Sequence, residues 1–267
     1  MKLSNKSISK NNEIREIRQK ITKLLRSDLS YIMIYGSVAR REKIKKDVDI
    51  IIAVRDALDV SSVKYEIEKL LFDKNREKGN ILDSILFFIE NFVGMNKSTV
   101  YICNKSDLEK ADFDKIFCKT RPIISSCILA PKTYILSGLK QDGKILYGNK
   151  KLLKEWNIKI RNSDRLRGFI RSMLFNFIAL LVFPILKKKS VEYSFYSIKS
   201  GILDSYTMNR GAPPKNILSC YKFFYKDNMC RQHLNNFENY RKGLPNRVNV
   251  IKTFIFLIKI YWFYEGV

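Results

Sequence analysis

Apolar and polar positions along the first third of the chain predict the order helix, strand, turn, strand and helix. Residues 11–26 carry apolar side chains at spacings of three and four, which is typical of an amphipathic helix. Two apolar runs follow, residues 31–35 and 47–53, and each has the length of a buried strand. Residues 63–71 return to the helical spacing. The pattern therefore predicts two neighbouring strands that pack against helices.

Further elements are predicted between residues 61 and 148. Ser61 or Ser62 can cap the helix over residues 63–71. Residues 99–103 read as a third strand, and residues 106–109 form a capping box that opens a short helix. A Gly-x-x-Leu-Tyr turn ending at Gly148 closes this part of the chain. A first domain over residues 1–150 is expected.

Beyond this boundary the pattern is helical throughout, and a second domain over residues 151–267 is expected. Residues 167–186 and 191–208 have helical spacing, and Gly211 stops the second of these helices. Residues 254–262 are apolar on most sides, which predicts a buried closing helix. The uninterrupted apolar run 177–183 is far shorter than the roughly 20 residues of a membrane span.

The segment between the first two strands is where spacing prescribes a chemistry. Gly36 and Ser37 end the first strand, and Asp47 and Asp49 lie ten and twelve positions after Ser37 in the second. Because side chains alternate along a strand, the two aspartates share one face, about 6 to 7 Å apart. Two carboxylates at that spacing suit a divalent cation, and a glycine-serine turn lets backbone N–H groups approach a phosphate.

This arrangement resembles the signature of the DNA polymerase β-like nucleotidyltransferase superfamily. It is most similar to the minimal nucleotidyltransferases, in which an Ala-Arg pair like Ala39-Arg40 also follows the turn. The resemblance implies an α+β protein: a nucleotidyltransferase-fold mixed sheet flanked by helices, followed by an all-α helical bundle. It also implies Mg²⁺ or Mn²⁺ held by two catalytic aspartates, and a nucleoside triphosphate, expected to be ATP. The residues implied are Asp47 and Asp49 for catalysis and metal, and Gly36, Ser37, Arg40 and Arg41 for the nucleotide.

Active members of this superfamily usually carry a third carboxylate on the strand beside the aspartates. The matching position here falls at or near Thr99, which is a weak ligand for Mg²⁺. Asp83 and Glu90 are the alternative candidates. Residues 80–92 read as a helix capped by Asn80, and there Asp83 and Glu90 would be capping or solvated residues. Both interpretations of this pair stay open.

Charge points to polyanionic partners. The chain carries 50 Lys and Arg against 26 Asp and Glu, a net charge of +24, with +10 in residues 1–150 and +14 beyond. Such a field favours nucleic acid, and RNA is the acceptor that it suggests. A nucleic-acid contact is expected at four arginines near one helix start: Arg161, Arg165, Arg167 and Arg171. The same charge is also consistent with lysines that only solvate the surface.

Other features exclude classes of site. The five cysteines form no C-x-x-C pair, which argues against a disulfide framework or a zinc site, and His233, the only histidine, is expected to serve packing or the surface. No P-loop or dinucleotide-binding motif is present. The first 26 residues are too polar for a secretory signal, so a cytoplasmic protein with no membrane partner is expected.

The sequence thus leaves two hypotheses. The first is an enzyme that transfers a nucleoside monophosphate from a nucleoside triphosphate to an acceptor hydroxyl, with pyrophosphate leaving. The acceptor could be RNA, a protein or a small molecule. The second is a catalytically weak protein of the same fold that binds nucleic acid or protein, and the missing carboxylate at Thr99 is its main support.

Overall fold

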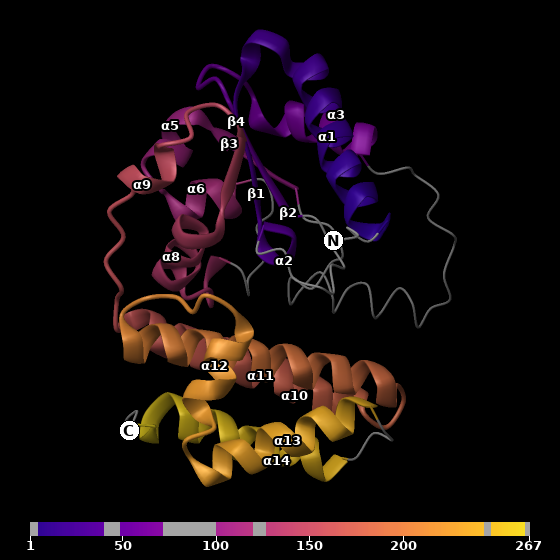
Figure 1. Cartoon of the computed structure of the whole chain (residues 1–267), viewed down its shortest axis with the longest axis vertical. Coiled ribbons are helices and arrows are strands. Elements are labelled where there is room, and N and C mark those ends of the chain that lie inside the picture. The colour runs from indigo at the N-terminus through magenta and orange to yellow at the C-terminus, as the bar shows by residue number, and fades with distance from the viewer. Residues whose placement is uncertain (1–4, 40–48, 72–99, 120–126, 243–246, 265–267) are drawn as a thin grey trace. The chain divides into compact units, whose positions relative to one another are not determined.

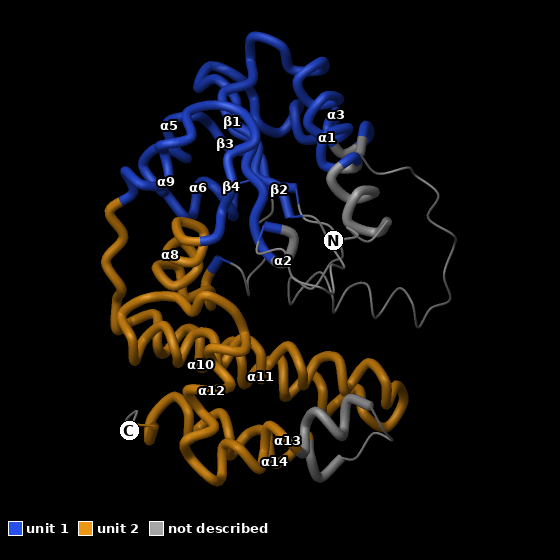
Figure 2. Tube along the Cα trace, viewed as in Figure 1, with its two compact units in different colours: residues 1–127, 142–156 blue, residues 128–141, 157–267 orange. Residues whose placement is uncertain are grey.

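The computed structural model of the chain describes residues 5–39, 49–71, 100–119, 127–242 and 247–264 (Figure 1). They form two compact units (Figure 2): residues 1–127 with 142–156, and residues 128–141 with 157–267. In this division residues 128–141 group with the second unit. The domain boundary expected at residue 150 stays a prediction.

The first unit is built on a four-stranded mixed sheet. Its strands are β1 (Leu29–Tyr35), β2 (Asp49–Val54), β3 (Val100–Asn104) and β4 (Lys144–Tyr147), and their order across the sheet is β3-β2-β1-β4. β1 pairs antiparallel with β2 and with β4, whereas β2 and β3 are parallel. The predicted first three strands are confirmed within the described residues. β2 is an inner strand, and this explains why Ile50 to Val54 are all buried.

Helices α1 (Asn5–Leu25) and α3 (Val60–Leu71) cover one face of this sheet. The predicted apolar positions Ile21, Leu25, Val63 and Ile67 are buried there, which confirms both helices. Leu24 and Leu70 are more than one third exposed and do not belong to the core. The cap of α3 differs from the prediction: the carboxylate of Asp59 accepts from the N–H groups of Ser61 and Ser62. Asp59 directly precedes the helix, so its carboxylate is placed to accept from these N–H groups.

The other face carries the short helices α5 (Lys105–Glu109) and α6 (Phe113–Phe117). The predicted capping box at residues 106–109 is wrong, because Ser106 donates from its N–H and its hydroxyl to Asp56, at the end of β2. A further short helix, α9 (Leu152–Glu155), is tied to α5 by Trp156, whose indole N–H donates to the carbonyl of Leu108 at 3.0 Å.

One cysteine pair differs from the sequence expectation. Cys118 and Cys127 form a disulfide, with Cα atoms 5.7 Å apart, while Cys103, Cys220 and Cys230 are free and buried. Residue spacing alone could not find this pair, because a separation of nine residues does not fix whether two cysteines come within disulfide distance.

The second unit is the all-α bundle that the sequence predicts. Its helices are α8 (Lys132–Asp142), α10 (Ser163–Val182), α11 (Lys187–Arg210), α12 (Ile217–Phe224), α13 (Asn228–Lys242) and α14 (Arg247–Ile258), which continues as a π-helical turn (Lys259–Phe263). Gly211 ends α11 in the left-handed conformation, as its position suggested. Among the described residues, no helix has the length and apolar character needed to cross a membrane.

The last helix is not buried all round. Val250, Phe256 and Leu257 of α14 are fully buried, but Ile251 and Ile255 are 47% and 58% exposed. The expectation of a buried closing helix is therefore wrong for one side of α14. The amino-acid pattern was apolar on both sides, and only packing decided which side the bundle covers.

Candidate active site

The site in the first unit begins where β1 ends. Tyr35 is the last residue of β1, and Gly36 follows with φ +72 and opens the short helix α2 (Gly36–Ala39). A residue with a side chain is strained in this left-handed conformation, so glycine is required for the chain to turn here.

The carboxylate of Asp49 lies against this glycine. In the antiparallel pairing of β1 and β2, Asp49 stands directly opposite Tyr35. A Cβ atom added to Gly36 would be only 2.5 Å from Oδ2 of Asp49, closer than van der Waals contact permits. The missing Cβ makes room for the carboxylate beside the turn. Gly36 and Asp49, which the sequence predicted to act together, are thus adjacent in space.

Several predicted site residues lie outside the described residues. They are Arg40, Arg41, Asp47, Asp83, Glu90 and Thr99. Ser37 lies in α2, and its side chain is also outside the description. The described part of the chain contains no group of three or more His, Cys, Asp or Glu side chains that could hold a metal ion. The roles assigned to these residues therefore stay predictions.

The sequence did not predict the aromatic group that lies beside Asp49. Tyr35, opposite Asp49, packs edge-on against Phe117 of α6 at 6.4 Å between ring centroids, and Tyr101 of β3 does the same at 4.8 Å. Opposed residues in a sheet share a face, so Asp49 and these tyrosines lie on the face that carries α5 and α6. Because side chains alternate along a strand, the positions of Tyr35 and Tyr101 within their strands were the feature of the sequence that indicated the face on which they lie.

Of the two predicted carboxylate ligands, Asp49 lies within the described residues, and it suits a hard cation. Asp49 is half-buried at the first position of β2, and its carboxylate oxygens are the ligand type that Mg²⁺ prefers. The backbone at Gly36 lies within contact distance of this carboxylate. Asp49 can therefore supply one ligand of a cation, and the site for a metal and a nucleotide stays a prediction. Asp47 would complete the pair.

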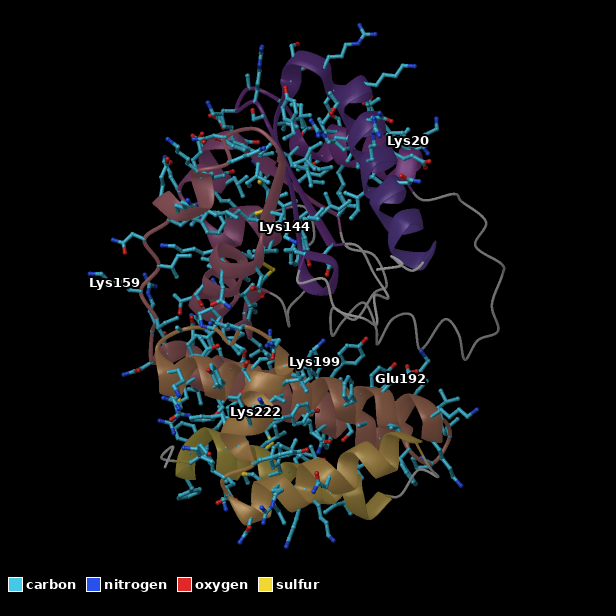
Figure 3. All side chains as sticks on the ribbon, viewed as in Figure 1. Lys20, Lys144, Lys159, Glu192, Lys199 and Lys222 are labelled. Atoms are coloured by element: carbon cyan, nitrogen blue, oxygen red, sulfur yellow. A yellow bond between two sulfur atoms is a disulfide. The ribbon has the colours of Figure 1, made fainter. Side chains whose placement is uncertain are left out.

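The arginines expected to bind nucleic acid have partners inside the second unit. The guanidinium of Arg167 pairs with the buried carboxylate of Asp164 at 3.3 Å, and that of Arg171 pairs with Asp204 at 3.0 Å. Arg165 donates to the carbonyl of Tyr261 and stacks over the ring of Trp262 at 4.4 Å. Lysines distributed over both units, such as Lys20 and Lys222, carry much of the remaining charge (Figure 3). Nucleic-acid binding through the arginines stays a prediction.

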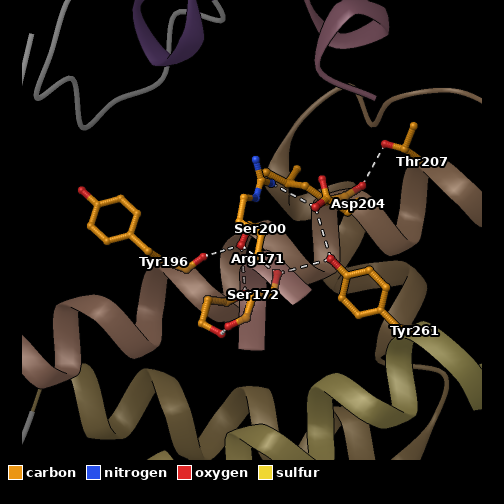
Figure 4. Close-up of polar contacts among 9 residues, drawn as sticks. Arg171, Ser172, Tyr196, Ser200, Asp204, Thr207 and Tyr261 are labelled. Carbon is orange, nitrogen blue, oxygen red and sulfur yellow. Dashed lines mark hydrogen bonds and ion pairs between the residues drawn. The ribbon is translucent and has the colours of Figure 1, made fainter. Parts of the chain in front are cut away.

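A polar network surrounds Asp204 of α11 (Figure 4). The hydroxyl of Tyr261 donates to Oδ2 of Asp204 at 3.2 Å, on the same oxygen that Arg171 contacts. Burial raises the pKa of Asp204 above its ordinary value, and the charge of Arg171 opposes this shift. Gly168 of α10 leaves the space for this carboxylate, because an added Cβ would lie 2.7 Å from Oδ2 of Asp204.

His233 serves packing, which is one of the two roles expected for it. Its ring stacks on Phe256 at 4.5 Å between centroids. Burial, together with the nearby charge of Lys252, lowers the pKa of His233 to about 4. The imidazole is therefore neutral at pH 7.

Comparison with known proteins supports the fold. The chain is similar to the crystal structure of spectinomycin adenyltransferase AAD(9) from Enterococcus faecialis with ATP and spectinomycin, with a TM-score of 0.54. The two are 16% identical, and the match covers 94% of this chain and 98% of that chain. No protein-family model and no curated protein sequence matches this chain. The likeness thus rests on the three-dimensional arrangement, and it shows a nucleotidyltransferase fold followed by a helical region.

Proposed function

We propose that this protein is a nucleotidyltransferase that uses ATP to transfer AMP to a hydroxyl group of an acceptor. The observation that carries the proposal is the carboxylate of Asp49 against Gly36, at the turn that ends β1. A carboxylate and a phosphate-binding turn in contact are what nucleotidyl transfer needs, because the protein's task is to position the triphosphate and its cation.

In this reaction the acceptor oxygen attacks the α-phosphorus of ATP. The bond between the α-phosphorus and the oxygen bridging to the β-phosphorus breaks, pyrophosphate leaves, and the acceptor hydroxyl loses its proton. Asp47 and Asp49 would hold Mg²⁺, which when bound neutralises charge on the phosphate oxygens. Gly36 and Ser37 would hold the β- and γ-phosphates through backbone N–H groups and the serine hydroxyl. Arg40 and Arg41 would contact the triphosphate as counter-charges.

The proposed acceptor is a small hydroxyl-bearing molecule. Three of the four arginines that suggested RNA have partners within the helical unit, namely Arg165, Arg167 and Arg171. The structural neighbour is named for spectinomycin, and nearly all of both chains takes part in the match. These two observations favour a small molecule over RNA. RNA is therefore included as an alternative acceptor in the experiment that follows.

The test is transfer of label from each of the four α-³²P nucleoside triphosphates, with Mg²⁺ or Mn²⁺. Three acceptor sets are compared: an aminocyclitol and aminoglycoside panel, total RNA, and protein. We expect label from ATP in a low-molecular-weight product. Asp49→Asn should reduce kcat/KM about 10³-fold, the loss seen when one electrostatic contact to a reacting group is removed. Glu66→Gln, which removes an exposed carboxylate from α3 of the same unit, is the matched control and should keep full activity.

Two outcomes would contradict the proposal. Label transfer that survives Asp49→Asn would show that the chemistry lies elsewhere. RNA or protein binding without any transfer, unaffected by this substitution, would instead support the catalytically weak binding protein.

A further inference from the structure

The helical unit leaves an extended apolar face uncovered on α10 and α14. On α10, Ile170, Phe177 and Leu181 are 41%, 49% and 60% exposed. On α14 and the turn that follows it, Ile251, Ile255 and Trp262 are 47%, 58% and 43% exposed. These six residues define the α10–α14 face. Within each helix their spacings of four, seven and eleven place them on one side.

The two stripes lie beside one another. Arg165, near the start of α10, contacts Tyr261 after the end of α14, whereas Asn176 further along α10 donates to the carbonyl of Val250 near the start of α14. The helices therefore run antiparallel in contact. The side of α10 that faces α11 is marked by Ser172, whose hydroxyl bonds to that of Ser200. The exposed stripe of α10 lies opposite that side, so nothing in the described bundle covers it.

This face has the size that a stable dimer needs. Leu166 and Ile258 extend the two stripes, with 51% and 38% exposure. At roughly 80 to 100 Å² for each half-exposed large side chain, the face offers on the order of 700 Å² of apolar surface. The largest apolar patch on a typical monomer is about 300–600 Å², and a standard protein interface buries about 800 Å² per partner.

We infer that the α10–α14 face binds a second copy of this chain. The face is uncharged at its centre, because α10 has no charged residue between Arg171 and its end and α14 has none between Lys252 and its end. Two copies can therefore meet there without burying like charges. Two antiparallel helix pairs that pack face to face about a two-fold axis form a four-helix bundle, which is a common form of isologous contact.

The cations around the face favour a protein partner over a lipid surface. Arg165 and Arg167 have the internal partners described above, and Lys259 pairs with Asp227. Lys252 is exposed and lies close enough to His233 of α13 for its charge to lower the pKa of that histidine. A helix that lies on an anionic membrane instead keeps cations free for the lipid headgroups.

Sedimentation of the 267-residue chain over a range of protein and salt concentrations tests this inference. We expect a species of twice the 31.4 kDa chain mass. Its association should tighten with salt, because each copy carries a net charge of +24 that salt screens. The double variant Leu181→Lys, Ile255→Lys should raise the dimer dissociation constant at least about 100-fold, since it places unpaired ammonium groups in the contact.

A matched variant keeps the experiment specific. Leu218→Lys, Met229→Lys adds the same charge at exposed positions of α12 and α13 and should leave the dimer intact. Thermal melting confirms that both variants fold, and Leu181→Ser, Ile255→Ser serves as an uncharged second variant that should also weaken the dimer. A monomer at all concentrations, or a dimer that only the matched variant disrupts, overturns the inference. So does a monomer that cosediments with phosphatidylglycerol vesicles less as salt rises, which would identify a lipid surface.

Discussion

Each unit places an aspartate against a glycine, and the surroundings of the two aspartates differ. In the sheet unit, Asp49 is half-buried at the start of a strand, beside a turn that only glycine can make without strain. In the helical unit, Asp204 is almost fully buried between helices, and Arg171 and Tyr261 bond to its carboxylate. The same local feature, a missing Cβ beside a carboxylate, occurs at the proposed nucleotide site in one unit and at an internal ion pair in the other.

A carboxylate in contact with a glycine therefore points to a functional site only where it is not buried and paired within the fold, as that of Asp204 is. A buried carboxylate with an arginine and a hydroxyl has its charge and its acceptor oxygens satisfied within the fold. A half-buried carboxylate at the first position of a strand can serve as a ligand for a cation.

The largest expected effect is in the helical unit. Arg171→Ala leaves the buried carboxylate of Asp204 without its cation, which should lower the free energy of unfolding by about 3 to 5 kcal/mol. Urea denaturation followed by circular dichroism measures this change. The double variant Arg171→Met, Asp204→Leu should recover most of the loss, because no charge then stays buried. A single variant as stable as the wild type would show that the pair is not buried in solution.

The glycines give a matched pair of substitutions. Gly168→Ala brings a Cβ within 2.7 Å of Asp204 Oδ2 and should destabilise the helical unit by about 2 to 3 kcal/mol, with transfer activity per folded molecule unchanged. Gly36→Ala brings a Cβ within 2.5 Å of Oδ2 of Asp49 and adds about 1 kcal/mol of backbone strain. Because the half-buried side chain of Asp49 can shift more easily than that of the buried Asp204, the loss of stability should stay at about 1 to 2 kcal/mol, but the shift should lower kcat/KM at least about tenfold. Denaturation and label transfer are measured on both. The reverse assignment of the two effects would refute the comparison.

The stability of the helical unit should depend on pH through His233. The unfolded histidine binds a proton near pH 6.5, whereas the folded one binds it only near pH 4, so protonation favours unfolding. Stability should be complete above pH 7 and fall by about 2 kcal/mol as the pH drops from 6.5 to 4, allowing for partial exposure of the ring.

Denaturation at several pH values measures this dependence. In His233→Gln the part of the slope between pH 4 and 6.5 should disappear. An unchanged slope in this variant would assign it to the carboxylates instead.

The smallest effect is expected in the sheet unit. The hydroxyl of Tyr31 donates to Oε1 of Glu109 at 2.8 Å, and burial, together with this carboxylate, raises the pKa of Tyr31 to about 12. Tyr31→Phe should lower the free energy of unfolding by only about 1 kcal/mol, because the bond is half-exposed.

The sheet unit was the more predictable of the two. The strands around the glycine-serine turn, the helices on either side and the contact between Gly36 and Asp49 follow from patterns within a short stretch of chain. The helical unit was predictable only as a set of helices. Arg171 and Asp204 are 33 residues apart, and Tyr261 lies a further 57 residues along, so no local spacing could indicate that they meet.

What the sequence alone determined is therefore the order of elements, the mixed α+β and helical character, and the turn that presents Asp49. These features depend on hydrophobic periodicity and on turn-forming residues, and both are local properties of the sequence. What the tertiary structure decided is which face of each helix is covered: it buried the partners of three arginines, grouped α8 with the helical unit, and left one side of α10 and α14 open. An apolar stripe predicts that one face of a helix is buried. Only the packing of segments that are distant in sequence decides which element covers that face.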